Sequence, residues 1–395
     1  MDASVWLLVS ILLSSLVPGL AIFTLREESV ALRTVLNLFG ATAKLVLVGV
    51  MIWGVFDGRI FESRLTLAPG LELVLHADEL SVLFVTLSTV LWLVTTVYAI
   101  GYLENTAHRS RFFGFFSLCV TATVGLALAG NLFTFVIFYE LLTLATYPLV
   151  AHKGTPEAVR GARIYLIYTL AGGVLLLVGA VWLRTIAGPL EFVQGGILGD
   201  IPGLDPWPLR WVFLLLIAGL GVKAALVPLH GWLPQAMVAP APVSALLHAV
   251  AVVKAGAFGI VRVVYDVYGV EFLASLHMLP LLGALAATTI IYGSARALSQ
   301  DLLKKRLAYS TISQVSYIAL GTAIVGPLAT IGGVVHLVHQ GIMKITLFFA
   351  AGNYAENLGV HRVSEMDGVG LRMPGTTLAF TIGALGMIGL PPVAG

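Results

Sequence analysis

The sequence predicts an all-α membrane protein with about twelve transmembrane helices. Of its 395 residues, 58% are hydrophobic and only 11% are charged, and the mean hydropathy is +0.98. Soluble domains average about 25% charged residues, so this chain lacks the polar residues needed to cover a water-facing surface. A soluble enzyme and a disordered chain are therefore excluded. The net charge of +2 is too small for a nucleic-acid partner.

Apolar runs recur along the whole chain, and a helix needs about 20 such residues to cross the hydrocarbon layer. The runs show no alternation of polar and apolar residues, which favours helices over a β-barrel. The predicted spans lie near residues 4–25, 34–56, 78–100, 113–130, 132–151, 164–187, 211–229, 243–265, 273–295, 307–325, 328–352 and 376–395.

The segments between the spans indicate the orientation. The first span has no basic leader and no A-x-A site, so we expect it to be a span and not a cleaved signal. With the N-terminus outside, thirteen lysines and arginines, including Lys304, fall in inner loops, and five, including Arg262, fall in outer loops. This excess agrees with the positive-inside rule. We expect a multi-pass protein of the cell inner or plasma membrane, with residues 188–210 as an extramembrane loop.

Ionisable residues inside the apolar runs point to function. A lysine at the bilayer centre costs about 3 kcal/mol or more, and such residues usually face a bundle interior or a hydrated path. Histidines titrate near neutral pH, and desolvated lysines can do so too. This pattern predicts proton transfer across several helices. The residues in or at the edges of these runs are Lys44, Glu140, Lys223, His230, His248, Lys254, His336, His339 and Lys344.

One helix carries a polar stripe. His336, Gln340 and Lys344 are each separated by four residues and therefore share a face, and His339 lies close to it. Such a stripe requires a partner helix or a file of water.

Other ionisable residues have structural alternatives. Glu140 and Lys223 could form a static ion pair that sets the helix register. We predict a structural role for Lys44, whose long stem could reach a neighbouring carbonyl. His230 could cap backbone groups freed beside Pro228.

Prolines break two of the predicted spans. Four of them lie between Lys223 and His248, and each removes a backbone donor, so this span must be discontinuous. A second pair, in GLPPVAG, lies in the last apolar run. The spacing predicts inverted repeats: N-terminal helices 1–3 in residues 1–110, a first repeat in 111–268 broken near 223–234, and a second in 269–395 broken near 390–395.

Several segments resemble one family closely. They include FYELLTLATYPLV, KAALVPLHGWLPQAMVAPAPVSALLHAVAVVKAG, DLLKKRLAYSTISQVSYIALG and HLVHQGIMKITLFFAAG. Over about residues 75–395 the chain resembles the antiporter-like subunits of Mrp-type Na+/H+ antiporters, membrane hydrogenases and respiratory complex I. DLLKKRLAYSTISQ and SEMDGVGLRMPGT look most like a D-type Mrp subunit.

The resemblance implies roles for individual residues. Glu140 matches the family's glutamate on the fifth helix and Lys223 the lysine on the broken seventh helix. Gln340 stands where members often have a second histidine, and His339 precedes it. Family members usually continue past PPVAG, so the resemblance implies an incomplete second repeat. The remaining matches are His248 on the eighth helix, Lys254 after it, and His336 and Lys344 on the eleventh.

We therefore expect a proton-translocating subunit of a cation/proton antiporter, working with other hydrophobic subunits in the lipid bilayer. Protons would move along the buried side chains, and Na+ would be handled elsewhere. No cofactor is expected, because the sequence has one cysteine, Cys119, and no iron–sulfur, flavin or nucleotide motif. The alternatives are a proton-pumping subunit of a complex I-type or hydrogenase complex, a non-conducting structural subunit, and a haem protein using His248 with His336 or His339.

Overall fold

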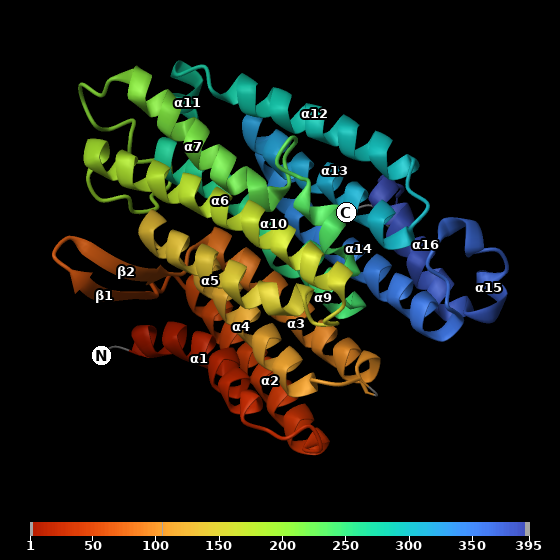
Figure 1. The fold of residues 1–395 in the computed structure, drawn as a ribbon. Helices are drawn as coiled ribbons and strands as arrows, with labels where there is room; N and C mark the ends of the chain where they lie inside the picture. The colour runs from red at the N-terminus through yellow and green to blue at the C-terminus, as the bar shows by residue number, and fades with distance from the viewer. Residues whose placement is uncertain (1–2, 105, 392–395) are drawn as a thin grey trace. The chain divides into compact units, whose positions relative to one another are not determined.

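The computed structural model describes residues 3–104 and 106–391, which form helices almost throughout (Figure 1). Their fold confirms the prediction of an all-α polytopic membrane protein. The contacts divide the chain into two compact units. The first comprises 1–149, 169–220 and 262–276, and the second comprises 150–168, 221–261 and 277–395. The units interleave along the sequence, so the predicted repeat boundaries stay a prediction.

The first unit contains the N-terminal helices. α1 packs against α2 and α4, and α3 packs against α2 and α4. Asp78 caps α3, because its carboxylate accepts a hydrogen bond of 2.7 Å from the backbone N–H of Ser81. The elements lying wholly or partly in this unit are α1 (Ala3–Phe23), α2 (Val30–Phe56), α3 (Glu79–Tyr102), α4 (Arg109–Ala127), α5 (Leu132–Val150), α6 (Pro156–Ala187), α7 (Pro206–Ala224), the π-helix η3 (Val263–Tyr268) and α11 (Val270–Ser275).

The second unit is built around a long helix, α14. α13 packs against α12 and α14, while α9, η2 and α16 also pack against α14. Its further elements are α8 (Trp232–Gln235), η1 (Ala236–Val238), α9 (Ala241–Ala245), the π-helix η2 (Leu246–Val250), α10 (Val252–Arg262), α12 (Leu279–Leu298), α13 (Leu303–Ala323), α14 (Pro327–Leu358), η4 (Val363–Glu365), α15 (Val369–Arg372) and α16 (Pro374–Ile388).

Ten helical segments of the described chain are long and apolar enough to cross a membrane. α13 and α16 occupy the positions of two further predicted spans. α13 begins among the basic residues Lys304, Lys305 and Arg306, and α16 is shorter than a full span. α16 ends at Ile388, and Gly389 follows in the left-handed conformation with φ 83°. Most of the second predicted helix break, near 390–395, lies outside the described residues.

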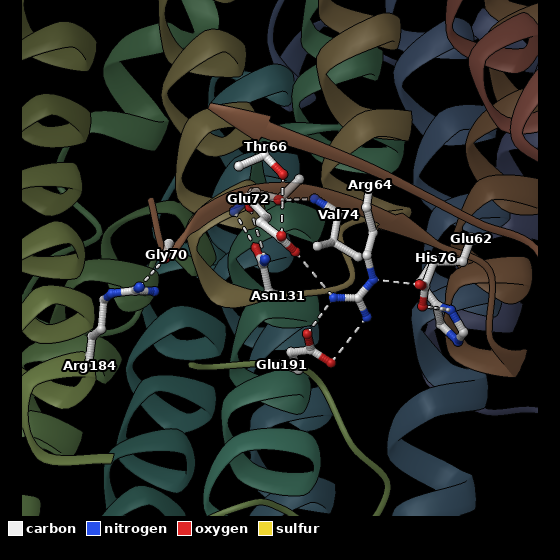
Figure 2. Close-up of polar contacts among 11 residues, drawn as sticks. Glu62, Arg64, Thr66, Gly70, Glu72, Val74, His76, Asn131, Arg184 and Glu191 are labelled. Carbon is white, nitrogen blue, oxygen red and sulfur yellow. Dashed lines mark hydrogen bonds and ion pairs between the residues drawn. The ribbon is translucent and has the colours of Figure 1, made fainter. Parts of the chain in front are cut away.

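A β-hairpin that we did not predict lies between α2 and α3. β1 (Glu62–Ala68) and β2 (Leu71–His76) pair antiparallel. The Pro-Gly dipeptide at the turn is the signal that could have found it, because Gly70 adopts φ 74° there. Figure 2 shows Arg64 on this hairpin among three carboxylates. Its guanidinium lies 2.5 Å from Glu62, 2.6 Å from Glu191 and 3.4 Å from Glu72.

The predicted break after Lys223 is present. α7 ends at Ala224, and regular α-helix resumes only in the short α8. The indole N–H of Trp232 donates to the Val222 carbonyl at 2.7 Å, and the backbone N–H of Val227 donates to the Thr289 hydroxyl at 3.0 Å. These bonds satisfy backbone groups that the broken helix leaves open, as non-helical backbone at membrane depth requires.

A buried ion cluster in the first unit joins two distant segments. Arg262 donates to Asp78 at 2.5 Å and 2.7 Å and to Asp266 at 2.6 Å. Burial raises the pKa of Asp78, but the hydrogen bonds and charge of Arg262 outweigh it, and the pKa is lowered to about 2. We expected Arg262 in an outer loop. It lies instead within the helical run that continues from α10 into η3, only 2% exposed.

Candidate functional site

The predicted polar stripe lies on α14 in the second unit. His336, Gln340, Lys344 and Phe348 follow at intervals of four residues and therefore share one face. Gln340 and Lys344 are fully buried, as is Phe348. An apolar helix that buries two polar side chains needs partners for them from its neighbours.

Lys344 finds its partners on α13. Its ammonium nitrogen lies 2.5 Å from the Ser310 hydroxyl and 3.3 Å from the Leu307 carbonyl. Ser310 could not be recognised as a partner from the sequence, because a serine in a transmembrane helix usually bonds its own backbone. The hydroxyl can both accept and donate, so it can pass a proton between the lysine and water.

His248 reaches the same face from η2. Its ring stacks on Phe348, with centroids 4.4 Å apart and planes at 21°. Both ring nitrogens are buried and have no hydrogen-bond partner within the described chain. π-helical turns such as η2 are frequent at functional sites.

Lys254 reaches α14 beside His336. The Lys254 ammonium donates to the carbonyl of Leu337, the residue after His336. A ring nitrogen of His336 lies 3.1 Å from the Gln314 carbonyl on α13. The structure thus brings His248 and Lys254 to α14, which carries His336 and Lys344. Their role as a proton relay stays a prediction.

A cavity of about 430 Å³ adjoins this face. Its lining includes His336, His339, Gln314 and Tyr317, with part of α16 on another side. A space of this size with several polar groups can hold water. His339, one of the lining residues, would contact such water. Gln340 is buried, and neither atom of its amide has a protein partner among the residues that the structure describes.

Two further basic side chains belong to this unit. His230 lies at the proline break, where its ring contacts Tyr292 with centroids 4.9 Å apart. Lys304, which we expected in an inner loop, begins α13 and donates to the Ala239 carbonyl. It lines a cavity of about 310 Å³ together with Lys305 and His361. The run Lys304, Lys305 and Arg306 is a sequence signal for the end of a helix. The same run is equally typical of a loop, so it does not identify the buried position of Lys304.

Glu140 and Lys223 belong to different units. Glu140, on α5, lies against Gly173 of α6, where an added Cβ would stand 1.8 Å from a carboxylate oxygen. Lys223 is fully buried in the last turn of α7. Their predicted interaction therefore stays a prediction.

Gly173 offers a direct test of the position of Glu140. Gly173→Ala is expected to displace the carboxylate and to lower proton translocation several-fold, since the added methyl and the oxygen cannot share that space. Gly49→Ala is the control, because nothing lies within 4 Å of a Cβ there. Proton uptake into vesicles containing the whole complex measures both. Equal rates in the two variants would show that Glu140 needs no fixed position.

Comparison with known proteins identifies two matching family models. The model described as "NADH:quinone oxidoreductase/Mrp antiporter, TM" matches residues 129–395. The model described as "NADH-Ubiquinone oxidoreductase (complex I), chain 5 N-terminus" matches residues 69–113. Together they cover most of both units.

Individual relatives agree with these models. NADH-quinone oxidoreductase subunit N of Desulforudis audaxviator (strain MP104C) is 38% identical over 330 residues, which are 82% of this chain and 64% of that protein. The A/B subunit of a probable K(+)/H(+) antiporter from Rhizobium meliloti (strain 1021) is 32% identical over 345 residues, 86% of this chain and 34% of that protein. The chain thus spans a third to two thirds of their lengths.

A solved structure shares the fold. The membrane-bound sulfane sulfur reductase, an archaeal respiratory membrane complex, contains a chain that superimposes with a TM-score of 0.88 at 25% identity. The match covers 97% of this chain and 78% of that chain.

Proposed function

Because this chain belongs to the NADH:quinone oxidoreductase/Mrp antiporter membrane family, we propose that it is a proton-translocating subunit of a multi-subunit cation/proton antiporter, of the Mrp D type. The observation that carries the proposal is the convergence on α14. His248 stacks on Phe348 and Lys254 bonds the Leu337 carbonyl, while His336 of the same helix lines a cavity. The similarity to a probable K(+)/H(+) antiporter supports it.

The proposed route follows α14. A proton held by Lys344 passes through the Ser310 hydroxyl or water to His248, and onward to Lys254 and His336. From His336 it enters the cavity that His339 lines. Lys254 and Lys344 repel each other when both are charged, so a proton arriving at one favours release from the other.

Glu140 and Lys223 would start this sequence. At an effective dielectric constant near 20, two unit charges about 4 Å apart interact by about 4 kcal/mol. Separating the two side chains, under the influence of a neighbouring subunit, would therefore decide whether Lys223 keeps its proton. Hard cations prefer clustered oxygen ligands, and this site is mainly basic, so Na+ would be bound elsewhere in the complex.

This proposed role implies a membrane location and partner subunits. The subunit would work among other hydrophobic subunits in the plasma membrane, with its N-terminus outside and its halves arranged as inverted repeats. Proton-pumping in a redox-driven complex is the second candidate, which the 38% identity to a quinone oxidoreductase subunit favours. The subunits that purify with this chain would distinguish the two, because only a redox complex carries electron-transfer centres.

The test is cation-driven proton movement in vesicles containing the whole complex. Glu140→Ala and Lys223→Ala are each expected to reduce this proton movement by on the order of 100-fold, because each removes one charge of the proposed Glu140–Lys223 pair. Arg59→Ala, at an exposed ion pair on the polar turn after α2, serves as the control. Wild-type exchange in both test variants would contradict the proposal.

A further inference from the structure

Lys44 lies at the centre of four helices in the first unit, far along the sequence from the α14 face. Its side chain is fully buried. The ammonium nitrogen lies 2.6 Å from the Ser15 hydroxyl on α1 and 5.0 Å from the centre of the Trp92 ring on α3. The Ser15 hydroxyl in turn lies 2.7 Å from that of Thr121 on α4. All four residues are near the midpoints of their helices.

These contacts are too few for a permanently charged lysine. An ammonium group has three donors, and within the described residues Lys44 has one oxygen acceptor and one aromatic ring. No carboxylate of the described chain forms an ion pair with it. We expected a structural lysine whose stem could reach a carbonyl, whereas its ammonium donates to the Ser15 hydroxyl. A buried charge without a counter-ion either loses its proton or is hydrated.

A row of polar atoms on α3 lies beside Lys44. Ser88, Trp92 and Thr96 are spaced four residues apart and share one face, and Thr89 adjoins them. The hydroxyls of these residues and the Trp92 indole N–H are buried, and none has a hydrogen-bond partner among described residues. A buried unmatched polar group costs about 1–3 kcal/mol, and water commonly satisfies such groups in native proteins. From Ser88 to Thr96 the row is about 12 Å long.

The polar row is continued on α2 toward one end of the unit. Asn37 and Arg33 are buried on the same face of α2 as Lys44, seven and eleven residues before it. The amide oxygen of Asn37 has no partner within the described part of the chain. Arg33 donates to the Ser110 hydroxyl at 2.9 Å and to the Glu27 carbonyl at 3.1 Å. Glu27 is 40% exposed in its side chain, so this end reaches the surface.

α3 carries the row toward the opposite end. Ser81 lies seven residues before Ser88 and accepts a hydrogen bond of 2.8 Å from Arg262. Arg262 also binds Asp78, which is 25% exposed in its side chain. α2 and α3 are antiparallel neighbours joined by the hairpin, so Arg33 and Ser81 mark opposite ends of the helices.

We propose that Lys44 is a proton-binding site in a hydrated path through α1–α4. Its neutral amine takes an excess proton from a hydronium ion in the path, which becomes water, and later gives that proton to the next water molecule, so no other reactant is needed. This site goes beyond the function proposed above, which uses no residue of these four helices.

Cysteine accessibility tests the hydration. The only cysteine of the sequence is Cys119, so Cys119→Ser provides a background without thiols. In it, Ser88→Cys and Thr96→Cys are expected to react with hydroxyethyl methanethiosulfonate at least 10-fold faster than Leu91→Cys, because this small neutral reagent attacks thiolates, which form in water. Leu91 is a buried apolar residue at a similar depth on the same helix. Equal, slow reaction at all three positions would overturn the proposal.

Proton binding is read separately, by nuclear magnetic resonance of the complex with ¹³C-labelled lysine in this chain. The sequence has seven lysines, and the signal missing from Lys44→Met belongs to Lys44. We expect this signal to move with pH while the protein stays folded. A signal that stays fixed over that whole range would overturn the proton-binding role. Neither readout depends on transport, so both remain informative if the α14 route is wrong.

Discussion

Lys344→Met is expected to reduce proton translocation by on the order of 100-fold or more, to the level of vesicles without the complex. In the proposed route, the substitution removes the group that holds the proton between Ser310 and His248. The fold should survive, because replacing a buried charge with an apolar side chain of similar size is often neutral or stabilising.

Lys344→Arg separates proton transfer from charge. Arginine keeps the positive charge but does not release its proton at physiological pH, so this variant is also expected to fail. Ile342→Met, on the same helix but 50% exposed, should translocate protons at the wild-type rate. The measurement is proton uptake by vesicles with matched amounts of complex. Activity above half of wild type in Lys344→Met would remove this lysine from the route, and activity in Lys344→Arg alone would mean that its charge suffices.

Arg262→Met is expected to destabilise the first unit by about 3–5 kcal/mol, because it leaves carboxylates uncompensated in a buried site. Arg262 joins Asp78, before α3, to Asp266 in η3. The thermal midpoint of the purified complex in detergent, followed by circular dichroism, measures the loss.

Arg59→Met is the matched control for this prediction. Arg59 also forms an ion pair, with Asp57, but both side chains are more than half exposed. Exposed pairs contribute about 0–1 kcal/mol, so this variant should unfold close to the wild-type temperature. An Arg262→Met complex as stable as the Arg59→Met complex would show that the buried cluster does not hold the unit together.

Much of the fold could be predicted because the membrane limits the choices. A run such as 78–100 must be helical, since only a helix satisfies its own backbone in hydrocarbon, and α3 begins at Glu79. The proline break after Lys223 was predictable for the same reason. The hairpin at Glu62–His76 was missed, because it lies between two predicted spans, where the bilayer imposes no such rule.

The candidate site was predictable only in part. The spacing of His336, Gln340 and Lys344 already places them on one face, because the helical period is a local property of the chain. Ser310 and Phe348 were not identified as partners, since such contacts depend on which helices pack together and in what register.

Lys44 shows most clearly what the sequence determines and what only the tertiary structure decides. Composition and hydropathy are enough to place a lysine inside a span and to show that its position is costly. Whether that lysine bonds a carbonyl, pairs with an acid or meets a row of unmatched hydroxyls depends on contacts between helices far apart in sequence. Local propensities determine the helices, whereas the surroundings of a buried charge are set by non-local packing.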